Sequence, residues 1–583
     1  MKLSDYVIQF LQSRGVEQCF LLPGGGAMHL VDSVGRNELP YVCFQHEQAA
    51  AIAAEAYGQH QNRPALLMVT SGPGATNAIT GVTAGWIDST PMFVISGQAK
   101  RSDLIGDTGV RQIGSQEVQT IAMVRSITKY AVEVMEPKEI RYHLERAWYE
   151  ATSNRPGPVW LSIPLDVQGA QIEENDLCGF SIPSRACVDL SGAVSRCVQL
   201  LKESRKPLLL AGNGIKLSGA EDALFALLQQ VPIPVQTTWK SIDLMGEEHP
   251  LYAGHPGIMG DRGANLILQE ADLLLSIGSR LDTSLTAFNE ANFAKCAKRI
   301  IVDIDPHELD RMNMEKEIAL ATDAGEFLQA LHDAFTQTTV SSETKEDWAA
   351  WRSHAKLLRA KYPVVTEEHR NKTRYVSPYY FIDLLCRNLD EQDIIVPESS
   401  GGAGEITYQA FQLKYGQKMK NAAGLGSMGF GLPYAIGSCI ANHGRRTILI
   451  NGDGAFQLNI QEMETLHRLN LPVKMFIWCN DGYGSIRNMQ NNNFGMCVAS
   501  GPDSGYTVPD VCAIAEAYGF TTHTVCNNQE LGDRLPEILQ KDGPSLCAVW
   551  VDPEETVSPR VKAFPQPDGS MKSGTLEDMW PKV

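Results

Sequence analysis

Several features that would point to other classes of protein are missing from this chain of 583 residues. Its thirteen cysteines are an odd number and include no Cys-x-x-Cys pair, which argues against a disulfide framework or a zinc site. No apolar run approaches the ~18 residues of a membrane span, and the N-terminus lacks the apolar core of a signal peptide. Basic residues are outnumbered 50 to 68, so nucleic acid and anionic membranes are poor partners. We expect a cytoplasmic protein.

Two polar, turn-rich stretches, 167–190 and 336–347, divide the chain and are expected to be surface connections. Apolar strands alternate with helical segments on both sides of them. This pattern predicts an α/β protein with three doubly wound parallel-sheet domains. We place an N-terminal domain at 1–170, a central domain at 190–335, a C-terminal domain at 370–560 and a tail at 561–583.

The most informative segment of the C-terminal domain runs from 446 to 484. An apolar strand ends at Gly452-Asp453-Gly454, a helical segment and a second strand follow, and the second strand ends at Asn480. A right-handed crossover brings both loops to one edge of the sheet, where Asp453 and Asn480 offer oxygen ligands to a hard cation such as Mg²⁺. The glycines at 452, 454, 482 and 484 allow backbone N–H groups to approach phosphate oxygens.

Gly-Asp-Gly followed about two dozen residues later by Asn resembles the signature of the thiamin diphosphate (ThDP) enzymes. The resemblance extends over nearly the whole chain and is closest to the acetolactate (acetohydroxyacid) synthase branch. Four further blocks carry it in the same order: 20–26 (FLLPGGG), 46–50 (HEQAA), 69–77 (VTSGPGATN) and 424–433 (GLGSMGFGLP).

The resemblance implies a role for each matched residue. The metal ligands would be Asp453, Asn480 and the carbonyl of Gly482. Glu47 would activate the cofactor through its pyrimidine ring, the Gly426 carbonyl would accept a hydrogen bond from the cofactor's amino group, and Met428 would hold the cofactor bent. The remaining implied cofactor-binding residues are Pro23, Gly24, Thr70, Pro73, Asn77, Gly401, Gly402, Gly452, Gly454, Ala455, Tyr483 and Gly484.

The central domain raises the question of FAD, which some acetolactate synthases bind there. Residues 212–214, 262–265, 278–280 and 303–305 resemble the nucleotide-contacting turns of such enzymes. Each turn alone is also an ordinary strand end. We expect FAD in a structural role, with ADP or no nucleotide as alternatives.

The family chemistry implied is decarboxylation of a 2-keto acid, with pyruvate as the preferred donor, and transfer of the acetyl unit to a carbonyl acceptor. Three departures concern the acceptor. Met489 stands where these synthases have Trp, Ser115 replaces Phe in a Phe-Gln-Glu block, and a Gln-His pair is missing from 398–402. They favour a different acceptor, such as a keto-deoxysugar. Residues assigned to the substrate pocket are Gly25, His29, Gln112, Ser115, Gln116 and Met489, with Gln116 as a catalytic candidate.

Three alternatives remain at this point. The chain is a true acetolactate synthase that joins two pyruvates, a ThDP-dependent C–C hydrolase, or a cofactor-binding subunit without catalytic activity. The family resemblance also implies a homodimer or homotetramer, because Glu47 and Asp453 lie in different domains and such sites form between subunits.

Overall fold

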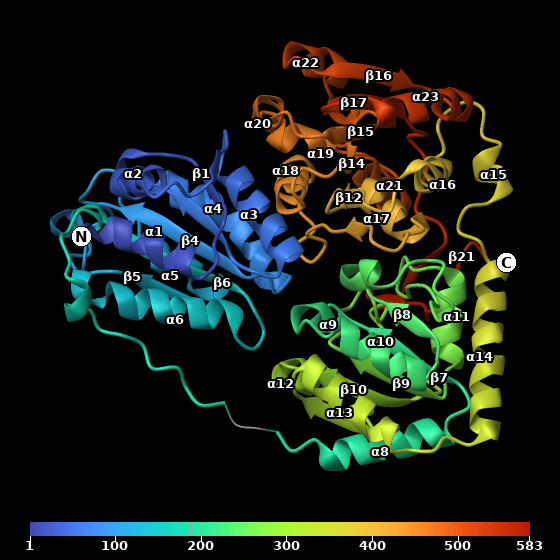
Figure 1. Cartoon of the computed structure of the whole chain (residues 1–583). Coiled ribbons are helices and arrows are strands. Elements are labelled where there is room, and N and C mark those ends of the chain that lie inside the picture. Colours follow the sequence, from blue (N-terminus) through green and yellow to red (C-terminus); the bar gives the residue numbers. More distant parts are fainter. Residues whose placement is uncertain (186–187, 583) are drawn as a thin grey trace.

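The computed structural model describes residues 1–185 and 188–582 and contains three parallel sheets with helices on both faces (Figure 1). The N-terminal domain is blue, the central domain green and the C-terminal domain orange to red. The fold class predicted from the sequence is therefore confirmed. Among the described residues, no helix combines the length and apolar character needed to cross a membrane.

The sheet of the N-terminal domain has the strand order β2-β1-β3-β4-β6-β5. Its central strands β3 and β4 are buried along their whole length, as expected for a parallel sheet covered on both faces. The elements of this domain are α1 (Leu3–Ser13), β1 (Cys19–Leu21), α2 (Met28–Arg36), β2 (Tyr41–Cys43), α3 (Glu47–Gln61), β3 (Ala65–Val69), α4 (Pro73–Ile87), β4 (Met92–Gln98), α5 (Thr120–Val124), β5 (Tyr130–Glu133), α6 (Ile140–Thr152), β6 (Pro158–Pro164) and α7 (Leu165–Gln168).

The central domain has the strand order β11-β10-β9-β7-β8. Its elements are α8 (Ser191–Glu203), β7 (Pro207–Ala211), α9 (Gly214–Leu217), α10 (Glu221–Gln230), β8 (Val235–Thr237), α11 (Arg262–Glu270), β9 (Leu273–Ile277), β10 (Lys298–Asp303), α12 (Pro306–Arg311), β11 (Ile318–Ala321) and α13 (Ala324–Thr336).

A long helix, α14 (Ser342–Lys361), follows the central domain and runs along its side (Figure 1). The sequence predicts a surface connection at 336–347, but residues 342–347 form the first turns of this helix. Trp348 and Trp351 explain the difference. Both side chains are buried against the central domain, and their indole N–H groups donate to the carbonyls of Ser204 and Pro207 at 3.1 and 3.0 Å.

The C-terminal sheet has the order β13-β12-β14-β15-β17-β16. The elements are α15 (Glu367–Arg370), α16 (Pro378–Asn388), β12 (Ile394–Pro397), α17 (Gly401–Ala410), β13 (Lys418–Met419), α18 (Gly431–Ala441), β14 (Thr447–Gly452), α19 (Asp453–Phe456), α20 (Glu462–Leu469), β15 (Val473–Cys479), α21 (Gly484–Phe494), α22 (Val511–Ala517), β16 (Thr521–Val525), α23 (Asn528–Gln540) and β17 (Ser545–Trp550).

The tail returns to the central domain. Strand β18 (Arg560–Val561) pairs with β21 (Met579–Trp580), and β19 (Ala563–Pro565) pairs with β20 (Met571–Ser573). Arg262 at the start of α11 holds this tail, because its guanidinium donates to the carbonyls of Met579, at 3.3 Å, and Pro581. The turn 262–265, expected to contact a nucleotide, therefore anchors the tail instead.

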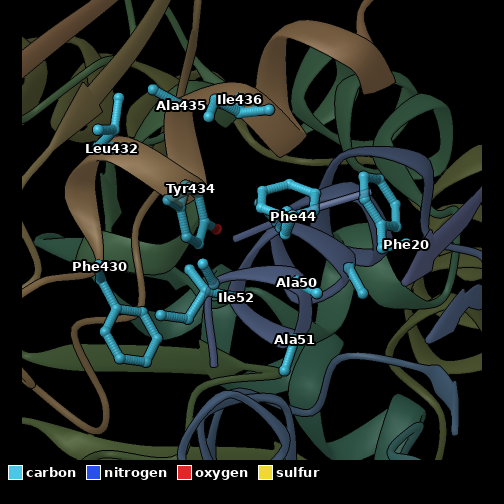
Figure 2. Close-up of a cluster of buried hydrophobic side chains, with 14 of the residues drawn as sticks. Phe20, Phe44, Ala50, Ala51, Ile52, Phe430, Leu432, Tyr434, Ala435 and Ile436 are labelled. Carbon is cyan, nitrogen blue, oxygen red and sulfur yellow. The ribbon is translucent and has the colours of Figure 1, made fainter. Parts of the chain in front are cut away.

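One hydrophobic core extends across the boundary between the N- and C-terminal domains. Phe44 and Ile52 lie opposite Phe430 and Tyr434 (Figure 2). Helices α3 and α18 pack so closely that a Cβ on Gly437 would lie 2.3 Å from the Ala53 carbonyl oxygen. The N- and C-terminal domains therefore share a closely packed apolar contact, which fixes their relative position.

Candidate active site

The loops after β14 and β15 meet at one edge of the C-terminal sheet, because these strands are parallel neighbours with Gly452 paired to Trp478. Asp453 is almost completely buried there. Its Oδ1 accepts from the Gly454 N–H at 2.7 Å, and its Oδ2 accepts from the N–H groups of Asn480 and Gly482 at 3.0 and 3.4 Å. The two segments predicted to hold a cation are thus in direct contact.

The residues at this edge fit a hard cation. The side-chain oxygen of Asn480 is buried and has no hydrogen-bond partner among the described residues. Burial raises the pKa of Asp453 to about 6, against the effect of the neighbouring backbone N–H groups. A buried carboxylate and an unpaired amide oxygen are both stabilised by a cation that takes oxygen ligands. Asp453, Asn480 and the Gly482 carbonyl would hold Mg²⁺ here.

A cavity of about 480 Å³ opens beside these loops. Its walls approach closely at two glycines, because a Cβ on Gly454 would lie 2.7 Å from the Tyr483 ring and one on Gly484 would lie 2.5 Å from the Asn480 amide nitrogen. The predicted cofactor residues that line the cavity are Gly401, Gly402, Gly426, Met428, Gly452, Gly454, Ala455, Asn480, Gly482, Tyr483 and Gly484.

The amino end of α17 forms one wall of the cavity. Gly401 is its first residue, with φ +73°, and the Gly402 N–H donates to Ser485 Oγ at 3.1 Å. Backbone N–H groups at the start of a ten-residue helix favour an anion. This wall suits a diphosphate. Sequence reasoning missed Ser485, although its place directly after Gly484 was a usable signal.

A second missed residue, Glu398, lies beneath the cavity at the end of β12. It is fully buried, and its Oε1 and Oε2 accept from the N–H groups of Ser399 and Gly431 at 2.8 and 3.1 Å. Burial raises its pKa to about 7. Glu398 therefore ties the loop after β12 to the segment that carries Gly426 and Met428.

The predicted residues of the N-terminal domain form a separate group at the edge of their own sheet. Glu47 begins α3 and is mostly buried, and its Oε2 accepts from Asn77 Nδ2 at 3.0 Å. Thr70 accepts from the Gly26 N–H at 3.1 Å, and a Cβ on Gly24 would lie 2.6 Å from Thr70 Cβ. Pro23 precedes this glycine and Pro73 begins α4.

Glu47 does not line the C-terminal cavity of its own chain, whose lining residues all come from the C-terminal domain. The amino end of α3 nevertheless touches that domain. Gln48 Oε1 accepts from Asn459 Nδ2 at 3.3 Å, and the Gln45 N–H donates to the Glu462 carboxylate at 3.1 Å. The two halves of the predicted site are therefore neighbours but are not joined within one chain.

The residues assigned to the substrate pocket lie in several places. Gly25 is exposed beside Gly24, and Gln112, Ser115 and Gln116 lie on an exposed loop. The Gln116 backbone packs against Gly72, where a Cβ would lie 2.4 Å from its carbonyl oxygen.

This exposed loop has a buried anchor that the sequence analysis did not identify. The Glu117 carboxylate accepts from the N–H groups of Ile105 and Ile113 at 2.5 and 3.0 Å. The acidic residue of the Ser-Gln-Glu block therefore shapes the loop, and its neighbours Ser115 and Gln116 face solvent.

Two residues assigned to the substrate pocket, His29 and Met489, lie outside both the C-terminal cavity and the N-terminal group around Glu47. The His29 ring lies against the end of α7, where a Cβ on Gly169 would be 3.1 Å from His29 Nε2. Met489 projects from α21 with 57% of its surface exposed and is not among the cavity-lining residues. Neither position in a single chain reaches the cofactor cavity.

A second candidate site lies between the N-terminal and central domains. Two adjoining cavities, of about 140 and 230 Å³, share Asp88, Lys240 and Arg280. The first contains three of the predicted turns: Asn213 and Gly214, Gly278 to Arg280, and Asp303 and Ile304. The Asp303 carboxylate is buried where a nucleotide ribose is often bound, after a strand of a parallel sheet.

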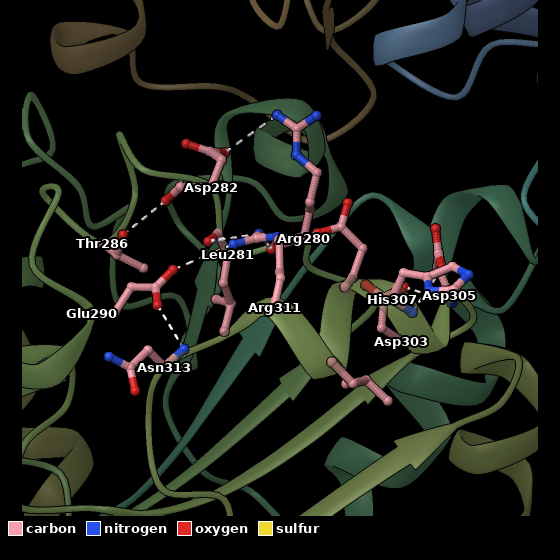
Figure 3. Close-up of polar contacts among 12 residues, drawn as sticks. Arg280, Leu281, Asp282, Thr286, Glu290, Asp303, Asp305, His307, Arg311 and Asn313 are labelled. Carbon is pink, nitrogen blue, oxygen red and sulfur yellow. Dashed lines mark hydrogen bonds and ion pairs between the residues drawn. The ribbon is translucent and has the colours of Figure 1, made fainter. Parts of the chain in front are cut away.

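Arg311 of α12 fixes the loop 278–281 of this second site, as Figure 3 shows. Arg311 donates to the carbonyls of Arg280 and Leu281 at 2.5 and 3.2 Å, and it pairs with Glu290 at 3.3 Å. The loop is thus fixed by the protein itself.

Fold and site together define a ThDP-dependent enzyme. Three models of the thiamine pyrophosphate enzyme family match the chain: the N-terminal TPP binding domain over 1–123, the central domain over 194–331 and the C-terminal TPP binding domain over 400–549.

Similar proteins indicate the branch of the family to which the chain belongs. The chain is 31% identical to a probable acetolactate synthase large subunit of Methanocaldococcus jannaschii, over 96% of this chain and 93% of that protein. It is 30% identical to the acetolactate synthase isozyme 2 large subunit of Escherichia coli (strain K12), over 99% and 100%, and to the acetolactate synthase large subunit of Lactococcus lactis, over 96% and 94%. The chain belongs to the thiamine pyrophosphate enzyme family, in its acetolactate synthase-like branch.

Proposed function

We propose that the protein is a ThDP- and Mg²⁺-dependent decarboxylase and carboligase that takes pyruvate as donor and transfers its acetyl unit to a carbonyl acceptor. The observation that carries this proposal is the cavity that combines glycine-lined walls with Asp453 and the unpaired Asn480 oxygen.

Different residues would bind the cation, the diphosphate and the rings of the cofactor. Asp453, Asn480 and the Gly482 carbonyl would hold the cation, and the amino end of α17 at Gly401 would bind the diphosphate. ThDP, when bound, supplies a thiazolium ring that accepts the electrons released when CO₂ leaves. Glu47 would hydrogen-bond to the pyrimidine ring of the cofactor, and its side chain is mostly buried. The Gly426 carbonyl and Met428, which line the cavity, would orient the cofactor.

A second copy of the chain would complete the site by placing its Glu47 over the cavity, so the working unit is a homodimer or a pair of homodimers. Apolar side chains at the end of α21 support this, because Phe494 and Met496 are 76% and 65% exposed and the first residues of the same helix line the cavity. Such a surface is typical of an interface.

Complementation tests the shared site. Chains with Glu47→Gln and chains with Asp453→Ala are co-expressed with different affinity tags and purified as mixed dimers. A shared site leaves one of the two sites intact, so activity returns to about half of wild type per dimer. Sites formed within single chains leave both defective, and the mixed dimer then stays inactive.

For the acceptor, we propose a carbonyl compound with several hydroxyl groups, such as a keto-deoxysugar. The exposed polar loop around Ser115 and Gln116, in place of an aromatic residue, supports a wide and hydrophilic acceptor pocket. Met489→Trp restores bulk at the other departure. We expect this variant to favour a second pyruvate over a sugar, measured as the ratio of products by mass spectrometry.

Acetolactate formation is the second candidate, and the names of the relatives favour it. Incubation with ThDP, Mg²⁺ and pyruvate alone separates the two. Slow CO₂ release without acetolactate supports a different acceptor, and rapid Glu47-dependent acetolactate production establishes the synthase. The Glu47→Gln variant is the control in both cases.

The second site is proposed to bind FAD in a structural role. The adjoining cavities at Asp303 and Arg280 support an extended dinucleotide. A yellow purified protein that releases flavin on denaturation supports this proposal. A colourless protein that releases ADP would instead identify a smaller nucleotide.

A further inference from the structure

A third cavity, of about 400 Å³, lies where the three domains meet. Its walls come from the end of α3, from α9 and α10, and from the segment around β13. Its lining residues include His60, Lys216, Asp243, Lys418 and Lys420. Asn213, Leu217 and Asp88 separate it from the proposed nucleotide site, to which they also contribute.

The lining includes three lysines and four carboxylates, and among the described residues Asp243 is the one carboxylate within ion-pair distance of these lysines. Lys216 Nζ lies 2.6 Å from Asp243 Oδ1. Lys420 is 4% exposed, yet its ammonium makes only long contacts, 3.8 Å to Asp243 and 3.5 Å to the Lys240 carbonyl. Lys418 adds a third charge. Asp243 therefore lies near two of the lysines, and Lys418 makes no ion pair among the described residues.

The other charged groups around the cavity do not change this balance inside. Asp88 pairs with Lys240 at 2.9 Å. Glu221 and Asp222 lie at the start of α10, where Asp222 is exposed. Burial and Lys216 both lower the pKa of Lys418, and burial lowers the pKa of Lys420 well below its ordinary value. Both lysines are thus short of negative charge in this structure.

Two buried polar atoms at this cavity, one on His60 and one on Asp243, have no hydrogen-bond partner among the described residues. His60 donates or accepts through Nε2 with Ser438 Oγ at 3.0 Å, and its buried Nδ1 has no partner among the described residues. The second oxygen of Asp243, also buried, has none either. Burial lowers the pKa of His60, so the ring is neutral and can donate through only one nitrogen. A ligand that accepts a hydrogen bond from His60 Nδ1 would remove the cost of leaving this nitrogen unpaired. The free Asp243 oxygen needs a donor and is not satisfied by an anion.

We propose that this cavity binds the phosphate group of a small molecule, with Lys418 and Lys420 as its charged ligands and His60 as a hydrogen-bonding neighbour. A phosphate dianion would supply the missing negative charge and several acceptors at once. Because the ligands come from two domains and Lys216 from the third, occupancy would fasten the three domains together. The cavity is therefore a candidate effector site, apart from the cofactor cavity.

Calorimetry on the holoenzyme tests the proposal, with ThDP, Mg²⁺ and FAD present at saturation so that other phosphate sites are filled. Inorganic phosphate is the first probe and glycerol 3-phosphate the second. Binding should be saturable and should take up protons, because the anion restores the pKa of the buried lysines. Tighter binding of the ester points to a phosphorylated metabolite, and equal or weaker binding points to free phosphate.

Lys418→Gln is expected to weaken binding at least about tenfold, since it removes a charge-assisted hydrogen bond. Lys345→Gln, the same change at an exposed lysine on α14, is the matched control and should bind as wild type does. Lys420→Gln provides a second test inside the cavity. The proposal is overturned by equal affinity in Lys418→Gln and the control, or by the lack of saturable binding.

Discussion

The N- and C-terminal domains arrange their strands identically, since β2-β1-β3-β4-β6-β5 and β13-β12-β14-β15-β17-β16 are the same order. In both, a reversal of strand order opens a crevice, between β1 and β3 and between β12 and β14. The loops at these crevices differ in chemistry. The N-terminal loops present Thr70 and small residues to Glu47, whereas the C-terminal loops present Asp453, Asn480 and helix-end N–H groups.

This difference shows how one architecture serves two tasks. The C-terminal crevice gathers oxygen ligands and N–H donors, which suit a cation and a diphosphate. The N-terminal crevice holds a mostly buried acid, which suits proton exchange with a ring. The following changes test that division, in order of expected effect.

Asp453→Ala should produce the largest effect. It removes the buried carboxylate that organises the loop at Asn480, so we expect ThDP and Mg²⁺ binding to be lost and activity to fall at least about a thousandfold. Tryptophan fluorescence titration and turnover assays measure the two quantities. A variant that still loads cofactor normally would contradict the assignment of the C-terminal crevice.

Glu47→Gln should reduce turnover about a hundredfold or more, because it removes the acid while keeping shape and the hydrogen bond to Asn77. Cofactor affinity should change little, in contrast to Asp453→Ala. A loss of turnover without a loss of cofactor affinity would show that Glu47 acts in catalysis and not in cofactor binding. Loss of both together would mean that the two crevices do not divide binding and catalysis.

Gly437→Ala tests the contact between the equivalent helices α3 and α18. The new methyl group would meet the Ala53 carbonyl oxygen at 2.3 Å, so we expect a loss of about 1–3 kcal/mol in the free energy of unfolding. Gly35→Ala in α2 is the control, because a Cβ there meets nothing within 4 Å and should be neutral or stabilising by up to about 1 kcal/mol. Denaturant unfolding followed by circular dichroism compares them.

Glu398 marks a further difference between the domains, since the N-terminal counterpart after β1 is Leu22. Burial raises the pKa of Glu398 to about 7, so its neutral form favours folding. This stabilisation is full below about pH 4.5 and is lost as the pH rises through 7, a change of order 1–3 kcal/mol. Glu398→Gln should remove this part of the pH dependence between pH 5 and 8.

Unfolding midpoints at both pH values measure this effect, with Glu464→Gln at an exposed position of α20 as the control. An unchanged pH dependence in Glu398→Gln would show that its carboxyl group is not the titrating element.

The sequence predicted much of this architecture because the signals involved are local. Strand, loop, helix and strand from 446 to 484 follow from apolar runs and glycines close together in the chain, and parallel pairing then places Asp453 beside Asn480. Arg262 was misplaced for a related reason. A turn looks the same whether it faces a nucleotide or a tail more than 300 residues away.

The sequence by itself therefore determined the three α/β domains, the chemistry of the cation loops and the family. Only the tertiary structure decided that α14 is a helix packed on the central domain and that Glu398 accepts a hydrogen bond from Gly431. It also decided that Glu47 remains outside its own chain's cavity and that Lys216 and Lys420, from distant segments, both lie near Asp243. Those outcomes depend on close packing between residues hundreds of positions apart. Composition and spacing contain no information about such contacts, because they are settled only when whole domains are packed against one another.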